Sequence, residues 1–307
     1  MPIILMKHTM HVTLILIAVF LFIQLFGLYA FSETMNVVTD AGGNTQVQYD
    51  ETVVGDRPEI SGFASLLYIL FGVLVGTGIV MLFVRFGQFR LWKGMYFMAI
   101  WLASSVTLGV FMGSAVAMAI ALILAVLELF RTNIYIHNLT EVFIYPGIAI
   151  LFAPLFNLFW VSVLLVIISV YDMFAVWKSG HMIKLAKFQT SSKAFAGFVI
   201  PYGKEKIHKA IPKGTSGKGG MRTAILGGGD IAFPLLFAGV VMEWLVTGAG
   251  LIKSVALAQS LLVSLMAAVA LFILFMKAEK DKFYPAMPFI SAGCFAGLGL
   301  IWLLSLL

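Results

Sequence analysis

Residues 142–177 read VFIYPGIAILFAPLFNLFWVSVLLVIISVYDMFAVW, an apolar run of 36 residues that contains one charged residue near its end. As a single helix this run would be about 54 Å long, whereas the hydrocarbon core of a bilayer is about 30 Å thick. Pro154 and Asn157 lie near its middle and predict a break, because proline cannot donate a helical hydrogen bond. We therefore expect two consecutive membrane spans here, the second of which carries Asp172.

The remaining apolar runs predict seven further spans. Residues 97–130 form a second run that is too long for one span, and Gly113-Ser114 near its middle is the expected turn. Single spans are expected at 11–31, 63–84, 223–245, 251–276 and 284–306. Lys7 followed by the first of these runs also has the pattern of a signal peptide, although the run is long for one. The predicted fold class is an all-α, polytopic membrane protein with nine transmembrane helices.

Composition supports this assignment and excludes several others. The chain is 61% hydrophobic and only 11% charged, whereas soluble proteins carry about 25% charged residues. The net charge of +6 does not indicate nucleic-acid binding, because the basic residues lie in short segments between apolar runs. Cys294 is the single cysteine, which excludes a disulfide within the chain. We expect no metal and no cofactor.

The distribution of Lys and Arg predicts the orientation of the chain in the membrane. With the N-terminus in the cytoplasm and the C-terminus outside, 18 of the 20 basic residues fall in inner segments, and only Arg57 and Lys253 fall outside. The chain then divides into an N-terminal membrane part (1–177), a basic cytoplasmic loop (178–222) and a C-terminal membrane part (223–307).

Two carboxylates lie inside predicted spans, where a charge costs about 2.5–3.5 kcal/mol at the centre. Asp172 is six residues before Lys178, and Asp230 is eight residues after Arg222. These separations correspond to depths of about 9 and 12 Å in consecutive antiparallel spans. The two side chains can therefore face each other. On these residues alone, a polar packing pair or an ion site fits as well as a catalytic pair.

A catalytic pair would work as in the aspartic proteases. Two apposed carboxyl groups share one proton, so that one activates water and the other protonates the scissile carbonyl oxygen. Gly227-Gly228-Gly229 directly before Asp230 predicts an irregular start of its span, which is tolerated at membrane depth where it lines a wet cavity. We expect Glu128 and Glu141, near the predicted inner loop, to be solvated.

Three short motifs resemble those of one protease family. Tyr171-Asp172, Gly227-Gly228-Gly229-Asp230 and Pro285-Ala286-Met287-Pro288 are similar to the YD, GxGD and PAL motifs of the presenilin and signal peptide peptidase family. Met287 departs from the leucine of the third motif, a change of similar volume. The resemblance implies an intramembrane aspartyl protease with Asp172 and Asp230 as catalytic residues. It also implies that the active site is shaped by Tyr171, Gly227, Gly228, Gly229, Pro285, Ala286 and Met287.

The expected substrates are transmembrane segments of other proteins, cut within the lipid bilayer. The inward N-terminus and the basic loop before the seventh span resemble presenilin, whereas Pro234 resembles signal peptide peptidase. The short chain resembles the microbial members, which implies the cell membrane of a prokaryote. Two alternatives use the same carboxylates: a prepilin-type peptidase with a GxGD aspartate, and a proton-coupled transporter. The sequence leaves the oligomeric state open.

Overall fold

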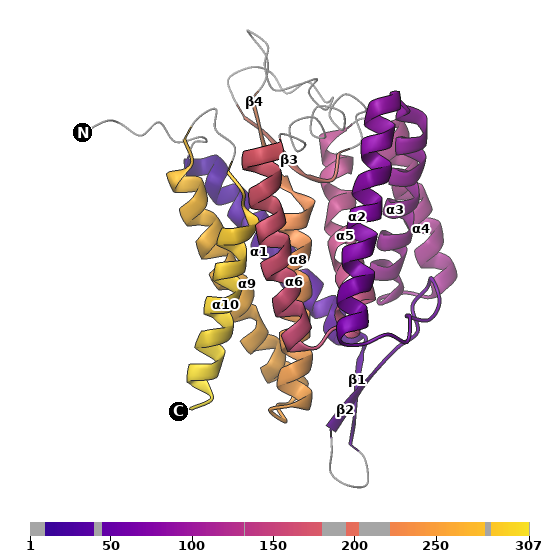
Figure 1. The fold of residues 1–307 in the computed structure, drawn as a ribbon. Coiled ribbons are helices and arrows are strands. Elements are labelled where there is room, and N and C mark those ends of the chain that lie inside the picture. The colour runs from indigo at the N-terminus through magenta and orange to yellow at the C-terminus, as the bar shows by residue number, and fades with distance from the viewer. Residues whose placement is uncertain are drawn as a thin grey trace, which may run out of the picture.

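Nine long helices form the body of the part of the chain that the structure describes (Figure 1). The computed structural model describes residues 10–39, 45–131, 133–179, 195–202, 222–279 and 284–306. Within these residues the helices are α1 (Met10–Glu33), α2 (Phe63–Phe86), α3 (Phe89–Gly109), α4 (Ser114–Phe130), α5 (Ile134–Phe152), α6 (Leu158–Phe174), α8 (Gly228–Thr247), α9 (Lys253–Lys277) and α10 (Met287–Leu304).

Both over-long apolar runs break where the sequence predicted. α3 ends at Gly109 and α4 begins at Ser114, with Gly113 as its N-cap. A 3-10 turn, η1 (Ala153–Leu155), follows α5 and contains Pro154. The side chain of Asn157 then accepts a hydrogen bond of 3.0 Å from the backbone N–H of Trp160 and so caps the start of α6.

The all-α prediction is wrong in one respect, because two short antiparallel hairpins accompany the helices. β1 (Met35–Thr39) pairs with β2 (Thr45–Tyr49), and β3 (Gly197–Tyr202) pairs with β4 (Arg222–Gly227). Residues 223–227, predicted to begin a span, are therefore strand, and the helix starts at Gly228. Apolar runs this short do not distinguish strand from helix by their period. In Figure 1 the two hairpins lie at opposite ends of the bundle, as do the start of α1 and the end of α10.

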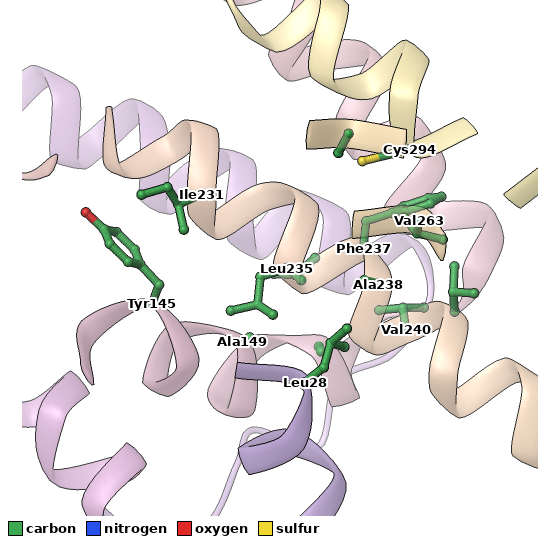
Figure 2. Packing of buried hydrophobic residues seen from close by; sticks show 14 of the residues in the cluster. Leu28, Tyr145, Ala149, Ile231, Leu235, Phe237, Ala238, Val240, Val263 and Cys294 are labelled. Carbon is green, nitrogen blue, oxygen red and sulfur yellow. The ribbon is translucent and has the colours of Figure 1, made fainter. Parts of the chain in front are cut away.

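α8 lies at the centre of the bundle and packs against α1, α5, α6, α9 and α10. Figure 2 shows Leu235 of α8 beside Ala149 of α5 and Leu28 of α1, all fully buried. A Cβ at Gly27 of α1 would lie 2.5 Å from the Leu235 side chain, so that only glycine lets these helices approach. Cys294 of α10 is also fully buried, which fits its expected packing role.

Seven of the described helices are long and apolar enough to cross a membrane; the two that fall outside this group are α3 and α4. α4 is apolar but has only 17 residues. Large apolar side chains cover the outside of the bundle, most clearly on α2, where Phe71 is 69% exposed and Leu74 is 62% exposed. In water such a surface would drive aggregation, whereas lipid tails match it.

Candidate active site

Asp172 lies in the last turn of α6, just before a single π-helical turn, Ala175–Ser179. Its carboxylate accepts a hydrogen bond of 3.1 Å from the backbone N–H of Met287, at the start of α10. The backbone N–H of Ala286 also bonds to it. The PAL-like segment and the YD motif, which are over a hundred residues apart in the sequence, are thus in direct contact.

Asp230 lies in the first turn of α8, directly after strand β4. Its side chain turns back over the strand end, because the backbone N–H of Gly227 donates to it. A Cβ at Gly227 would lie 3.1 Å from Asp230 Oδ2, closer than ordinary contact. The N-terminal end of a helix also favours a negative charge.

The structure brings the two carboxyl groups together. α6 packs against α8, and both helices pack against α10. The two carboxyl groups are near enough to interact electrostatically. Both side chains are half-buried.

The three glycines do not form the irregular segment that the sequence predicted. Gly227 is extended, with φ −64° and ψ 143°, whereas Gly228 and Gly229 already belong to the first turn of α8. The backbone thus changes from strand to helix over a single residue. A Cβ at Gly228 would lie 3.0 Å from the hydroxyl oxygen of Tyr145.

The PAL-like segment lies just before and at the start of α10. Pro285 is buried, Ala286 is the N-cap of α10, and Met287 is only 4% exposed. About one turn from this contact on each helix, the hydroxyls of Ser169 on α6 and Ser291 on α10 lie 2.8 Å apart and hydrogen-bond. This buried pair joins the two helices beside the contact between Asp172 and Met287.

Tyr171 is placed differently from the other predicted site residues. Its side chain is 40% exposed on α6. Consecutive helical residues project about 100° apart, so the tyrosine does not share the direction of Asp172. The structure therefore brings together the two aspartates, the glycines and the PAL-like segment, but not the Tyr171 ring.

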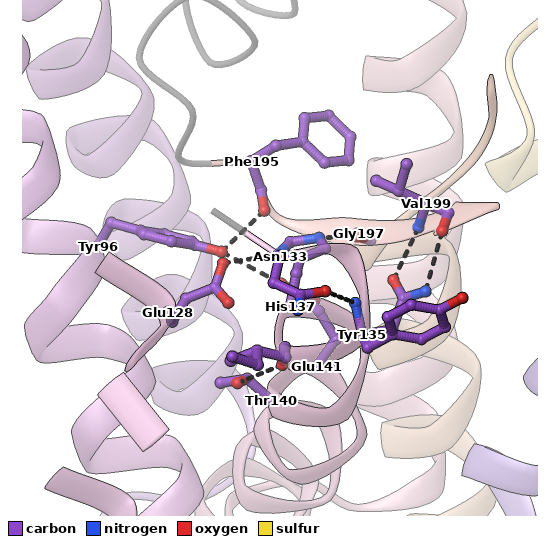
Figure 3. A network of polar contacts seen from close by, with 12 residues as sticks. Tyr96, Glu128, Asn133, Tyr135, His137, Thr140, Glu141, Phe195, Gly197 and Val199 are labelled. Carbon is purple, nitrogen blue, oxygen red and sulfur yellow. Dashed lines mark hydrogen bonds and ion pairs between the residues drawn. The ribbon is translucent and has the colours of Figure 1, made fainter. Parts of the chain in front are cut away.

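A buried polar cluster beside the site was missed by the sequence reasoning (Figure 3). Glu128 and Glu141, expected to be solvated, are only 4% and 1% exposed. Glu128 bonds to His137 at 2.7 Å, and Glu141 accepts a hydrogen bond from the hydroxyl of Tyr145. The signal was available in the spacing, because His137, Glu141 and Tyr145 recur every four residues and so share one face of a helix.

Gln24 is a second missed residue. It is fully buried on α1 and donates through Nε2 to the carbonyl of Ile231 at 2.9 Å, one residue after Asp230. Its Oε1 accepts from Ser264 of α9 at 3.1 Å. A single polar residue in an apolar span predicts an interhelical contact, although not which one.

Comparison with known proteins gives this site a context. Residues 44–306 match the sequence model of the family described as "Signal-peptide peptidase, presenilin aspartyl protease". The chain belongs to this family. It is therefore an aspartic endopeptidase and an integral, multi-pass membrane protein.

The fold agrees with that assignment. A solved presenilin family intramembrane aspartate protease superposes with a TM-score of 0.61, over 95% of this chain and 99% of that chain. The two sequences are only 17% identical, so this likeness concerns the fold. No curated protein sequence matches the chain.

Proposed function

We propose that this protease hydrolyses peptide bonds within transmembrane segments, with Asp172 and Asp230 as its acid–base pair. The observation that carries the proposal is their juxtaposition on packed helices at the end of the bundle where β4 and the PAL-like segment meet. Backbone N–H groups of Met287 and Gly227 hold the two carboxyl groups from opposite sides. Neither carboxyl needs a cation as its partner.

The chemistry follows from the shared proton of such a pair. Two apposed carboxyl groups in a low-dielectric site do not both ionise, so one is charged and the other protonated. The charged group takes a proton from water, which attacks the scissile carbonyl carbon. The protonated group donates to the carbonyl oxygen as the tetrahedral intermediate forms. When this intermediate collapses, the first carboxyl group donates its proton to the leaving amine, and the second takes a proton from a hydroxyl of the intermediate. The pair thus regains its single proton, and no covalent bond to the enzyme forms.

A substrate helix must unwind before this reaction, because its carbonyls are engaged in its own hydrogen bonds. The unwound segment then needs new backbone partners, since unpaired groups are costly in lipid. We propose that it pairs with the open edge of β4, the edge that faces away from β3. That edge ends at Gly227, three residues before Asp230. Addition of a strand to an exposed sheet edge is a common mode of peptide binding.

The same proposal includes the membrane arrangement. The nine long helices of the described residues place the start of α1 and the end of α10 at opposite ends of the bundle. This arrangement supports nine spans, a cytoplasmic N-terminus and an outer C-terminus. The Asp pair then lies toward the cytoplasmic side. Within this arrangement residues 178–222 form the inner connection between the two membrane parts, in the cell membrane of a prokaryote.

The decisive test is cleavage of a transmembrane peptide by the purified protein. We expect Asp172→Asn and Asp230→Asn each to lower the rate by at least about 10³-fold, because each removes one half of the acid–base pair. Both variants keep nearly the same shape and should keep the melting temperature of the parent. Substantial cleavage by either variant would overturn the assignment. Proton uptake coupled to solute transport, with no cleavage, would favour the transporter instead.

A further inference from the structure

Side chains of α5 bond the outer edge of β3 at Gly197 and Val199, and a side chain of α3 bonds the chain just before the strand. In an antiparallel pair, alternate residues direct their backbone groups away from the partner strand. Asn138 bonds both groups of Val199, donating to its carbonyl at 2.9 Å and accepting from its N–H at 3.1 Å. His137 Nε2 lies 2.7 Å from the Gly197 carbonyl, and Tyr96 donates to the Phe195 carbonyl at 2.8 Å (Figure 3).

His137 can make its contact in only one way. The Gly197 carbonyl can only accept, so Nε2 must carry a proton. The other ring nitrogen, Nδ1, lies 2.7 Å from Glu128 Oε1. Whether the intervening proton is on the ring or on the carboxyl group, Glu128 occupies Nδ1 and keeps Nε2 as the donor.

These contacts reach the catalytic end of α8 through the hairpin. Gly197 pairs with Gly227, and Gly228 N–H lies 3.4 Å from the Ala196 carbonyl. Gly197 has φ +145°, and a Cβ there would lie 2.5 Å from the Leu226 carbonyl, so β3 is held tightly against β4. The hydroxyl of Tyr145 donates a hydrogen bond to Glu141 and lies beside Gly228, where an added Cβ would be 3.0 Å from it. The side chains of α5 therefore contact β3 and the first residue of α8, two residues before Asp230.

Packing alone does not explain this cluster. Its members are almost fully buried, and burial of polar or charged groups costs free energy even when they are paired. Glu128 Oε2 has no hydrogen-bond partner among the described residues, which adds to that cost. Apolar side chains would fill the same space more favourably. We therefore attribute the cluster to the fixed positions that its hydrogen bonds impose on the groups they join.

We propose that His137, held by Glu128, is a positioning residue of the active site: its Nε2–H fixes β3 by the Gly197 carbonyl and thereby sets the position of β4 and Asp230. The effect of His137 on catalysis rests on the proposed function, whereas its effect on the hairpin does not. Because side chains of α5 occupy the outer edge of β3, the far edge of β4 is the one without a strand partner among the described residues. An incoming substrate strand would thus be aligned by a hairpin that α5 holds from behind.

Two measurements on the purified, full chain test this proposal. Amide hydrogen exchange, read by mass spectrometry over residues 197–202 and 222–227, reports the hairpin without any substrate. Cleavage kinetics of a transmembrane peptide report kcat and KM separately. The variants are His137→Phe, which removes both ring contacts, and Glu128→Gln, whose amide can donate to Nδ1 and so keeps Nε2 protonated. Ser104→Ala is the control, since Ser104 is fully buried on α3 and its hydroxyl lacks a partner among the described residues.

We expect His137→Phe to speed exchange in both strands and to lower kcat by about tenfold, the effect of losing one buried hydrogen bond. Glu128→Gln and Ser104→Ala should remain close to the parent chain in both measurements. Unchanged exchange in His137→Phe, or a loss in Glu128→Gln as large as in His137→Phe, would overturn the proposal. If His137→Phe does not fold, Glu128→Leu is compared with Glu128→Gln. Equal exchange of the β3–β4 hairpin in these two variants would contradict the proposal.

The two proposals fail separately. If the parent chain cleaves no transmembrane peptide, the proposed function is wrong, while the exchange comparison still tests the role of His137. If cleavage depends on both aspartates but exchange does not depend on His137, only the positioning role is lost.

Discussion

Gly228 is a residue of the glycine run at which a side chain has little room. A Cβ there would lie 3.0 Å from the Tyr145 hydroxyl oxygen and 3.1 Å from its ring. At Gly229, by contrast, the nearest atom is a ring carbon of Phe233 at 3.7 Å, an ordinary contact. The run therefore combines two crowded positions, Gly227 and Gly228, with one that has room for a side chain, although the sequence shows three equivalent glycines.

This difference predicts opposite outcomes for two alanine substitutions. Gly228→Ala should displace Tyr145 or the start of α8, at a cost of about 1–3 kcal/mol, and should lower kcat because Asp230 moves with that turn. Gly229→Ala should leave kcat within about twofold and raise stability by up to about 1 kcal/mol, since alanine favours helix over glycine. Cleavage rates and melting temperatures of both variants check this. Equal loss of activity in both would contradict the contact with Tyr145.

Gln24 supports the same turn of α8 from the opposite side. Pro234 lacks the N–H that would bond the Asp230 carbonyl in a regular helix, so this turn has one hydrogen bond fewer. The bond from Gln24 to the Ile231 carbonyl stabilises the turn from α1, and Ser264 orients the amide. One polar side chain thus joins three helices beside the candidate catalytic residue.

Gln24→Leu should therefore lower both stability and activity. It leaves the Ser264 hydroxyl without its acceptor, for a loss of about 1–3 kcal/mol in the free energy of unfolding. Ser264→Ala is the matched control, because it removes one bond but leaves the contact with Ile231. Thermal unfolding in detergent and kcat measure the two effects. A Gln24→Leu variant as active as Ser264→Ala would show that the α1 contact does not position Asp230.

At the scale of elements, the β3–β4 hairpin and the start of α10 surround the Asp pair. β3 has one edge on β4 and the other on α5, which leaves the far edge of β4 as the free one in the described hairpin. Because Val199 directs its backbone groups toward Asn138, its partner Ile225 directs its own groups away from β3. The side chain of Ile225 is 38% exposed.

Proline substitutions in β4 can distinguish the backbone bonds that β4 makes to β3 from those that it would make to a substrate strand. Ile225→Pro removes an N–H at the open edge, which edge strands tolerate, so the hairpin should persist while cleavage falls by about tenfold. Ile225→Ala controls for the lost side chain and should retain more activity. Leu226→Pro removes an N–H that faces β3 and should disrupt the hairpin itself. Full activity in Ile225→Pro would exclude strand addition at this edge.

At the scale of the whole molecule, length and polarity separate α3 and α4 from the other helices. α4 spans about 26 Å, slightly less than the hydrocarbon core, and Arg90 and Lys93 occupy the first turns of α3. A short helix can be accommodated by local thinning of the bilayer. The nine-span arrangement therefore predicts that the turn at Gly113 reaches the outer surface.

Cysteine labelling tests that arrangement. The only native cysteine, Cys294, is fully buried, so the parent chain should label weakly. With a membrane-impermeant maleimide on intact cells, we expect Gly113→Cys to react and Gln88→Cys to react only after permeabilisation. Both positions are exposed in the structure. Reaction of both residues from the same side would remove α3 as a membrane span, and the reverse pattern would invert the orientation.

The sequence by itself determined the helical architecture and indicated the residues of the candidate site. Apolar runs of fixed length are dictated by the bilayer, and their breaks at Gly113 and Pro154 follow from local backbone chemistry, so both could be read without tertiary information. The two aspartates stood out because a charge in an apolar span is costly. Their predicted depths rested on helical rise, which does not apply before Asp230 because residues 222–227 are strand.

Only the tertiary structure decided how these parts are held. Residues 197–202 pair with residues 222–227 as strands, and side chains of α5 bond the outer edge of β3 through contacts that join residues about 60 apart. Glu128 and Glu141 looked solvated because their partners are distant in the sequence or one helical turn away on a face that only packing buries. Pairing of strands and burial of polar groups depend on non-local partners, which the spacing of residues along the chain does not specify.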